Sequence, residues 1–75
     1  MRVINEIARD IRADWTNVCY SAAPYLDAMF SLNRITDDYY EDIGKSVVLY
    51  FLANAQTWRG STARAIKAEL KAMLK

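Results

Sequence analysis

The chain has 75 residues, a formal net charge of +1 and no histidine, and 53% of its residues are apolar. This length allows one domain, residues 1–75, and leaves no room for a second domain or a long linker. The single cysteine excludes a disulfide framework, and the lack of histidine excludes a Cys/His zinc site. Because so small a core supplies only about 3–5 kcal/mol of net stability, a homodimer stays open as a further source of stability.

The first segment, MRVINEIARDIRADW, has charged residues every few positions and no apolar stretch, so we expect no signal peptide. The longest apolar run, residues 47–53, is far shorter than the roughly 20 residues of a membrane span. We therefore expect a cytoplasmic protein without membrane contact, in a reducing compartment that suits a lone thiol. The apolar residues of this segment recur with helical spacing and predict an amphipathic helix: Ile4, Ile7, Ala8, Ile11 and Trp15.

A second helix is expected to start near Ser21, which can serve as its N-cap, with Pro24 tolerated in the first turn. Asn33 is a plausible end. The predicted buried side of this helix consists of Tyr25, Leu26, Met29, Phe30 and Leu32.

The segment ITDDYYEDIGKS is expected to begin a third helix, because Thr36 or Asp37 can cap it and acids in its first turn complement the helix dipole. In the alternative, residues 36–42 form a separate short turn and the main helix begins only near Asp42. Apolar residues then follow on nearly all sides, which is typical of a buried central helix over about 43–59.

Gly60 is suited to end this helix as its C′ residue, and Ser61 or Thr62 to cap the last helix. The last helix should bury Ala63, Ile66, Leu70, Met73 and Leu74. These elements predict an all-α fold, a compact bundle of three to four helices around the buried central helix. The residues expected in its core are Ile11, Trp15, Met29, Val47, Phe51, Trp58, Ile66 and Leu70.

The sequence offers little for catalysis. DIGKS lacks the second glycine of a phosphate-binding loop, and Cys19 has no basic neighbour in sequence to activate its thiol. The four acids of residues 37–42 could ligate Mg²⁺, but a solvated helix start explains them better. We therefore expect no catalytic residue, no metal and no cofactor, and a protein that is not an enzyme.

Positive charge gathers in the C-terminal segment, at Arg59, Arg64, Lys67, Lys71 and Lys75. The last four fall within about 80° on one side of a helix. A small DNA-binding regulator would use such a stripe to follow phosphates, with TWRGST as the turn of a helix-turn-helix. Against this function, only Arg64 stands where base-reading side chains should cluster, and basic stripes are commonly plain solvated surface.

Negative charge gathers in the segment TDDYYED, which has four acids and no base. Such a cluster can imitate a phosphate backbone and occupy a basic groove on another protein, while its tyrosines add rigid contact area. The alternative is an ordinary capped helix start. The predicted partner-binding acidic face consists of Asp37, Asp38, Tyr39, Tyr40, Glu41 and Asp42.

The stretches YLDAMFSL, SVVLYFLANAQTWRG and AIKAELKAMLK resemble small helical proteins encoded on phages and integrative elements of Gram-positive gut bacteria. The resemblance implies a setting in which short proteins act by stoichiometric binding to host proteins, including defence nucleases such as CRISPR effectors. It assigns no residue a role. We expect a non-enzymatic protein-binding module, with a protein partner favoured over nucleic acid.

Overall fold

The described part of the chain, residues 3–34, 38–39 and 42–74 of a computed structural model, forms four helices and one short two-stranded ladder. This arrangement confirms the predicted all-α bundle. Within the described residues, no helix combines the length and the apolar content needed to cross a membrane. The elements in chain order are α1 (Ile4–Asp14), α2 (Ala23–Met29), β1 (Asp38–Tyr39), β2 (Asp42–Ile43), α3 (Gly44–Ala53) and α4 (Ser61–Met73).

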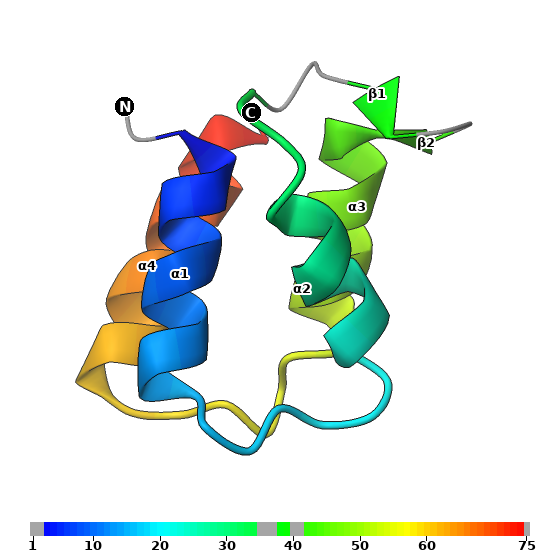
Figure 1. The fold of residues 1–75 in the computed structure, drawn as a ribbon. Coiled ribbons are helices and arrows are strands. Elements are labelled where there is room, and N and C mark those ends of the chain that lie inside the picture. Colours follow the sequence, from blue (N-terminus) through cyan, green and yellow to red (C-terminus); the bar gives the residue numbers. More distant parts are fainter. Residues whose placement is uncertain (1–2, 35–37, 40–41, 75) are drawn as a thin grey trace.

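The helices lie in two antiparallel pairs, α1 with α4 and α2 with α3, and α1 also packs against α2 (Figure 1). The segments after α1 and after α3 cross at the same end of the bundle, where they connect one pair to the other. One hydrophobic core takes residues from all four helices and from these connections. The pairs are therefore held together by side chains of helices and loops alike.

α1 has the buried stripe that its spacing predicts. No side chain caps its first turn. Instead, the N–H groups of Ile4 and Asn5 donate to the carbonyls of Asn33 and Leu32, at 2.9 and 3.0 Å, and the Asn5 side chain donates to that of Asn33 at 2.8 Å. The segment after α2 thus satisfies backbone donors that a helix start leaves free. The fully buried residues of α1 are Ile4, Ile7, Ala8 and Ile11.

α2 begins at Ala23, with Ala22 as its N-cap and no side-chain capping bond, so the prediction that Ser21 caps it is wrong. The chain turns before the helix, because the carbonyl of Cys19 accepts the N–H groups of Ala22 and Ala23, both at 3.1 Å. This turn replaces a capping side chain. Pro24 lies in the first turn, as predicted.

α2 also ends earlier than predicted, at Met29 rather than near Asn33. The N–H groups of residues 30–32 each bond to the carbonyl three residues back, so a tighter turn continues the chain. That turn returns Leu32 to the core, where it is fully buried, but leaves Phe30 partly exposed. The expectation that Phe30 is buried is wrong for this reason.

α3 is shorter than the helix predicted over 43–59. The backbone N–H and the side-chain Nδ2 of Asn54 both donate to the Tyr50 carbonyl, at 3.2 and 2.8 Å, and close the last turn. Residues 54–60 then form turns. Trp58 reaches the core from these turns, and helical spacing alone could not distinguish that position from a place on the helix.

The start of α3 agrees with the alternative in which the main helix begins near Asp42, since β2 directly precedes Gly44. α3 is also open on one side. Leu49 is 47% exposed and Tyr50 is 52% exposed, so the helix is not buried on nearly all sides. Its buried residues are Gly44, Val47, Val48 and Phe51.

Gly60 is the N-cap of α4 rather than the end of the preceding helix, and Ser61 is the first helical residue. Neither Ser61 nor Thr62 caps α4, since no side-chain bond closes its start. Gly60 has φ 116° and ψ 177°, a backbone conformation that is essentially restricted to glycine. The chain therefore enters α4 through a conformation that needs this residue.

The core contains a cluster of three aromatic rings where the connecting segments meet. Trp15 and Trp58 stack with centroids 5.7 Å apart, and the Phe51 ring meets both edge-on, at 6.2 and 6.4 Å. Asp14 on α1 accepts a hydrogen bond of 2.8 Å from the Trp58 indole. The predicted core is confirmed, because each of its members is buried: Ile11, Trp15, Met29, Val47, Phe51, Trp58, Ile66 and Leu70.

Candidate binding surfaces

The predicted acidic face falls largely outside the described residues. Of its members, the structure describes the backbone of Asp38, Tyr39 and Asp42, which lie in the antiparallel ladder with Tyr39 paired to Asp42. The expectation that these acids occupy the first turn of the third helix is wrong, since that turn has no acidic residue. β2 directly precedes α3, so the acidic segment leads into the start of that helix. The members outside the described residues are Asp37, Tyr40 and Glu41.

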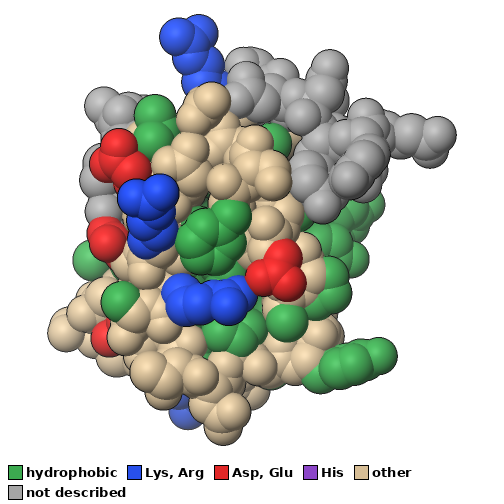
Figure 2. All heavy atoms as spheres, in the orientation of Figure 1, with side chains coloured by type: hydrophobic (Ala, Val, Ile, Leu, Met, Phe, Trp, Pro, Cys, Tyr) green, Lys and Arg blue, Asp and Glu red, His purple; other side chains and the backbone are tan. Residues whose placement is uncertain are grey.

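An exposed apolar surface lies on α3, which we call the α3 outer face and define as Leu49 and Tyr50 with Tyr25 of α2. The rings of Tyr25 and Tyr50 are 5.5 Å apart and inclined by 35°. Figure 2 shows hydrophobic side chains reaching the surface along the edge of the molecule where α3 lies. The sequence predicted a helix that is apolar on nearly all sides, but only the structure decides which of these apolar residues stay exposed.

The residues of the predicted basic stripe divide into different environments. Arg59, Arg64 and Lys71 are exposed, Lys67 is half-buried, and Lys75 lies outside the described residues. A surface depression of about 300 Å³ gathers Arg59, Arg64 and Lys67, and leaves Lys71 outside its lining. We call this depression the α4 hollow. Its full lining is Trp58, Arg59, Gly60, Ala63, Arg64 and Lys67.

Lys67 supports the chain that precedes α4. Its Nζ donates to the carbonyls of Ala55 and Trp58, both at 2.7 Å, and lies 5.8 Å from the Trp58 ring centroid. Burial lowers the pKa of Lys67, and the positive charges of Lys71 and Arg59 lower it further. Two of the three ammonium donors therefore hold residues 54–60 in place.

The segment TWRGST is not the tight turn of a helix-turn-helix. Residues 54–60 separate α3 from α4, whereas that motif joins its helices through a 3–4-residue turn. α3 packs against α2, and α4 against α1. Trp58 is buried in the aromatic cluster instead of lying at a surface. A DNA-binding role for the basic stripe stays a prediction, without this motif as support.

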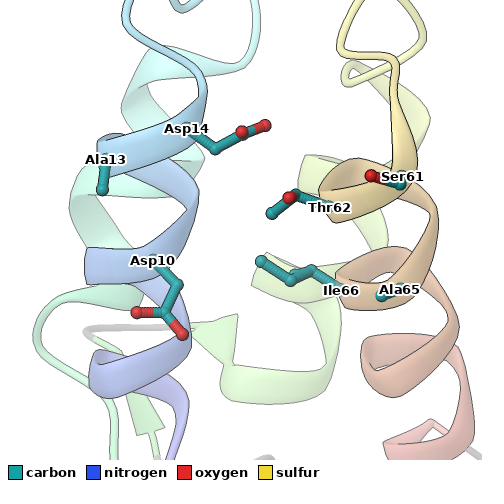
Figure 3. A pocket seen from close by; sticks show the side chains of 7 residues that line it. All are labelled: Asp10, Ala13, Asp14, Ser61, Thr62, Ala65 and Ile66. Atoms are coloured by element: carbon teal, nitrogen blue, oxygen red, sulfur yellow. The ribbon is translucent and has the colours of Figure 1, made fainter.

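An open groove runs between α1 and α4 (Figure 3). Its volume is about 560 Å³, and it is lined by Asp10, Ala13, Asp14, Ser61, Thr62, Ala65 and Ile66. Asp10 and Asp14 are one helical turn apart, so both carboxylates reach this groove from the same flank of α1. The spacing of the two acids was visible in the sequence. The hydroxyl groups of Ser61 and Thr62 lie opposite them only because α4 packs beside α1. Among the described residues, no group of three or more His, Cys, Asp or Glu is placed to hold a metal.

Cys19 is half-buried between the turn before α2 and the end of α3. Its Sγ donates to the Asn54 carbonyl at 3.2 Å and lies 3.6 Å from the Ser21 hydroxyl oxygen. The hydrogen bond with Ser21 is the main cause of a lowered pKa of the Cys19 thiol, and burial opposes it. The thiol thus links two turns.

Comparison with known proteins yields no match: no protein-family model, no curated protein sequence and no solved structure is similar to this chain. The resemblance to proteins of mobile elements therefore stays a prediction, as does the homodimer. Val48 is buried within the single chain and so is not part of the exposed side of α3.

Proposed function

We propose that this chain is a small non-enzymatic module that acts by stoichiometric binding to another protein. The observation that carries the proposal is the α3 outer face, where Leu49 and Tyr50 project from a helix into solvent. Tyrosine is enriched among the residues that dominate binding energy in protein interfaces. The Tyr25 ring packs against Tyr50 at an incline, and this contact lowers the entropy lost when a partner covers the Tyr50 ring.

The partner that this surface suits is a protein with a basic groove. Residues 36–42 contain four acids and no base, and this segment leads directly into α3. Opposite charge speeds encounter and orients the two surfaces, while the apolar residues contribute contact area. A binding surface that combines the acidic face with the α3 outer face would thus recognise a protein that itself handles nucleic acid.

The concrete form of the proposal is an accessory protein of a mobile element that inhibits a host defence nuclease, such as a CRISPR effector. Its support is the resemblance described above and the four acids that lie close together in DDYYED. We place the protein in the cytoplasm, where its one cysteine would stay reduced. No catalysis, metal or cofactor is part of this function.

Affinity capture followed by calorimetry tests this function. The chain would be used to capture one host protein in a fixed ratio, and the complex would then be measured with purified components. Two variants should lose capture while their far-UV circular dichroism stays unchanged. The first is Tyr50→Ala, and the second combines Asp37→Asn, Asp38→Asn, Glu41→Gln and Asp42→Asn.

The matched control combines Arg64→Gln with Lys71→Gln, two exposed cations on α4. It should leave capture unchanged. The proposal would be contradicted if this control lost capture while both surface variants kept it. That result would indicate that the basic stripe binds the partner.

A further inference from the structure

The α4 hollow concentrates positive charge, and its lining contains no acidic residue. Among the described residues, no ion pair joins Arg59 or Arg64 to a carboxylate. Lys67 contributes a third cation to the same lining. Side chains of like charge around a concave surface reinforce one another's potential and attract a counter-ion of opposite sign.

The backbone in this hollow adds to the positive potential. Gly60 has no side chain to cap α4, and the first turn of the helix has no acidic residue. A Cβ built at Gly60 would meet nothing within 4 Å, so the space beside this residue is open. A ligand could thus reach both the guanidinium groups and the backbone N–H groups at the start of α4.

We propose that the α4 hollow binds the phosphate group of a small molecule. Guanidinium groups have the planar fork of donors that matches the oxygens of a phosphate, and the hollow offers one from each side of Gly60. Its volume of about 300 Å³ lies at the lower end of the range for small-molecule sites. Arg59 and Arg64 are the contacting residues, while Lys67 holds the segment that carries Arg59.

The geometry favours one localised phosphate over the backbone of a duplex. A duplex is held by cations spread along its length, whereas here the cations converge on one hollow and Lys71 lies outside it. The net charge of +1 also gives little general attraction to nucleic acid. This site is independent of the acidic face and the α3 outer face, so it does not rest on the proposed function.

Nuclear magnetic resonance titration at constant ionic strength tests the site, with inorganic phosphate, adenosine diphosphate and a short DNA duplex as separate probes. Phosphate should shift the amide signals of Gly60, Ala63 and Arg64 in a saturable way. Loss of one charged contact in Arg64→Gln should raise the dissociation constant about tenfold, and Arg59→Gln should act alike. If adenosine diphosphate binds more tightly than inorganic phosphate, the ligand is a nucleotide. If the two dissociation constants are equal, the ligand is free phosphate.

Lys71→Gln is the matched control, because it removes the same charge from an exposed position on the same helix. It should change the dissociation constant less than about twofold, since a charge outside the hollow acts on the ligand only across solvent, where salt screens the interaction. Equal weakening by Lys71→Gln and Arg64→Gln would overturn the proposal and leave diffuse charge attraction. Absence of saturable shifts, or tighter duplex binding that depends equally on Lys71, would overturn it as well.

Discussion

At the scale of single residues, neighbours in sequence have opposite roles. Phe51 is fully buried and meets two indole rings edge-on, while Tyr50 beside it is half-exposed and its ring is tilted against that of Tyr25. Lys67 and Lys71 likewise lie one turn apart on α4, yet only Lys67 bonds to backbone carbonyls in the described structure. Residue type therefore says little about which of these side chains stabilises the fold and which is free to bind.

Phe51→Ala should lower the free energy of unfolding by about 3–5 kcal/mol, because it removes a fully buried ring from the aromatic cluster and leaves a cavity. Urea unfolding followed by circular dichroism measures this change. Leu49→Ala is the control on the exposed side of the same helix, and it should cost only about 0.5 kcal/mol. Equal stability of Phe51→Ala and the parent would show that the core is assigned wrongly.

Lys67→Met keeps much of the side-chain length but removes the ammonium that two carbonyls share. We expect it to lower the free energy of unfolding by about 1–3 kcal/mol, since Ala55 and Trp58 would lose a charged donor. Lys71→Met removes the same charge without such bonds and should leave stability nearly unchanged. If both variants unfold alike, the support that Lys67 gives to residues 54–60 is refuted.

At the scale of elements, the starts of α1 and α4 depend on backbone groups and not on capping side chains. The first turn of α1 is completed by carbonyls at Leu32 and Asn33, and the start of α4 depends on the backbone of Gly60. Side-chain caps, which sequence reasoning expected at Ser21 and at Ser61, do not occur at these ends.

Gly60→Ala should lower the free energy of unfolding by about 1–3 kcal/mol, because alanine disfavours a φ of 116°. A steric clash plays no part, since the space beside Gly60 is open. Ser61→Ala should leave stability unchanged, whereas loss of a capping serine would cost about 1 kcal/mol. Thermal melting of both variants measures the two changes in stability. A larger loss of stability in Ser61→Ala than in Gly60→Ala would show that Ser61 caps the helix.

At the scale of the whole molecule, the two helix pairs share one core. Trp58 reaches that core from residues 54–60, stacks on Trp15 and donates to Asp14. These contacts tie the segment between α3 and α4 to the end of α1, so neither helix pair has a core of its own. The molecule should thus behave as one cooperative unit.

Unfolding should accordingly follow a single transition. Tryptophan fluorescence reports on the junction of the connecting segments, and far-UV circular dichroism reports on the four helices. Their midpoints in urea should coincide, because the junction cannot loosen while both helix pairs stay packed. Two separated midpoints would mean that the pairs unfold independently.

The sequence by itself determined the all-α class, the buried stripe of α1 and every member of the predicted core. Helical spacing and side-chain hydrophobicity are local properties, and they suffice to say which residues leave water. The sequence also identified the charged segments at residues 36–42 and 59–75 as candidate surfaces.

Only the tertiary structure decided where the helices end and which candidate side chains are free. The end of α3 and the placement of Trp58 depend on bonds that Asn54 and Lys67 make to backbone carbonyls, and no periodicity encodes such bonds. Packing on α2 leaves Leu49 and Tyr50 open, although their helix looked apolar throughout. The α4 hollow likewise exists because the turns before α4 bring Arg59 beside Arg64, a proximity that only the folded backbone creates.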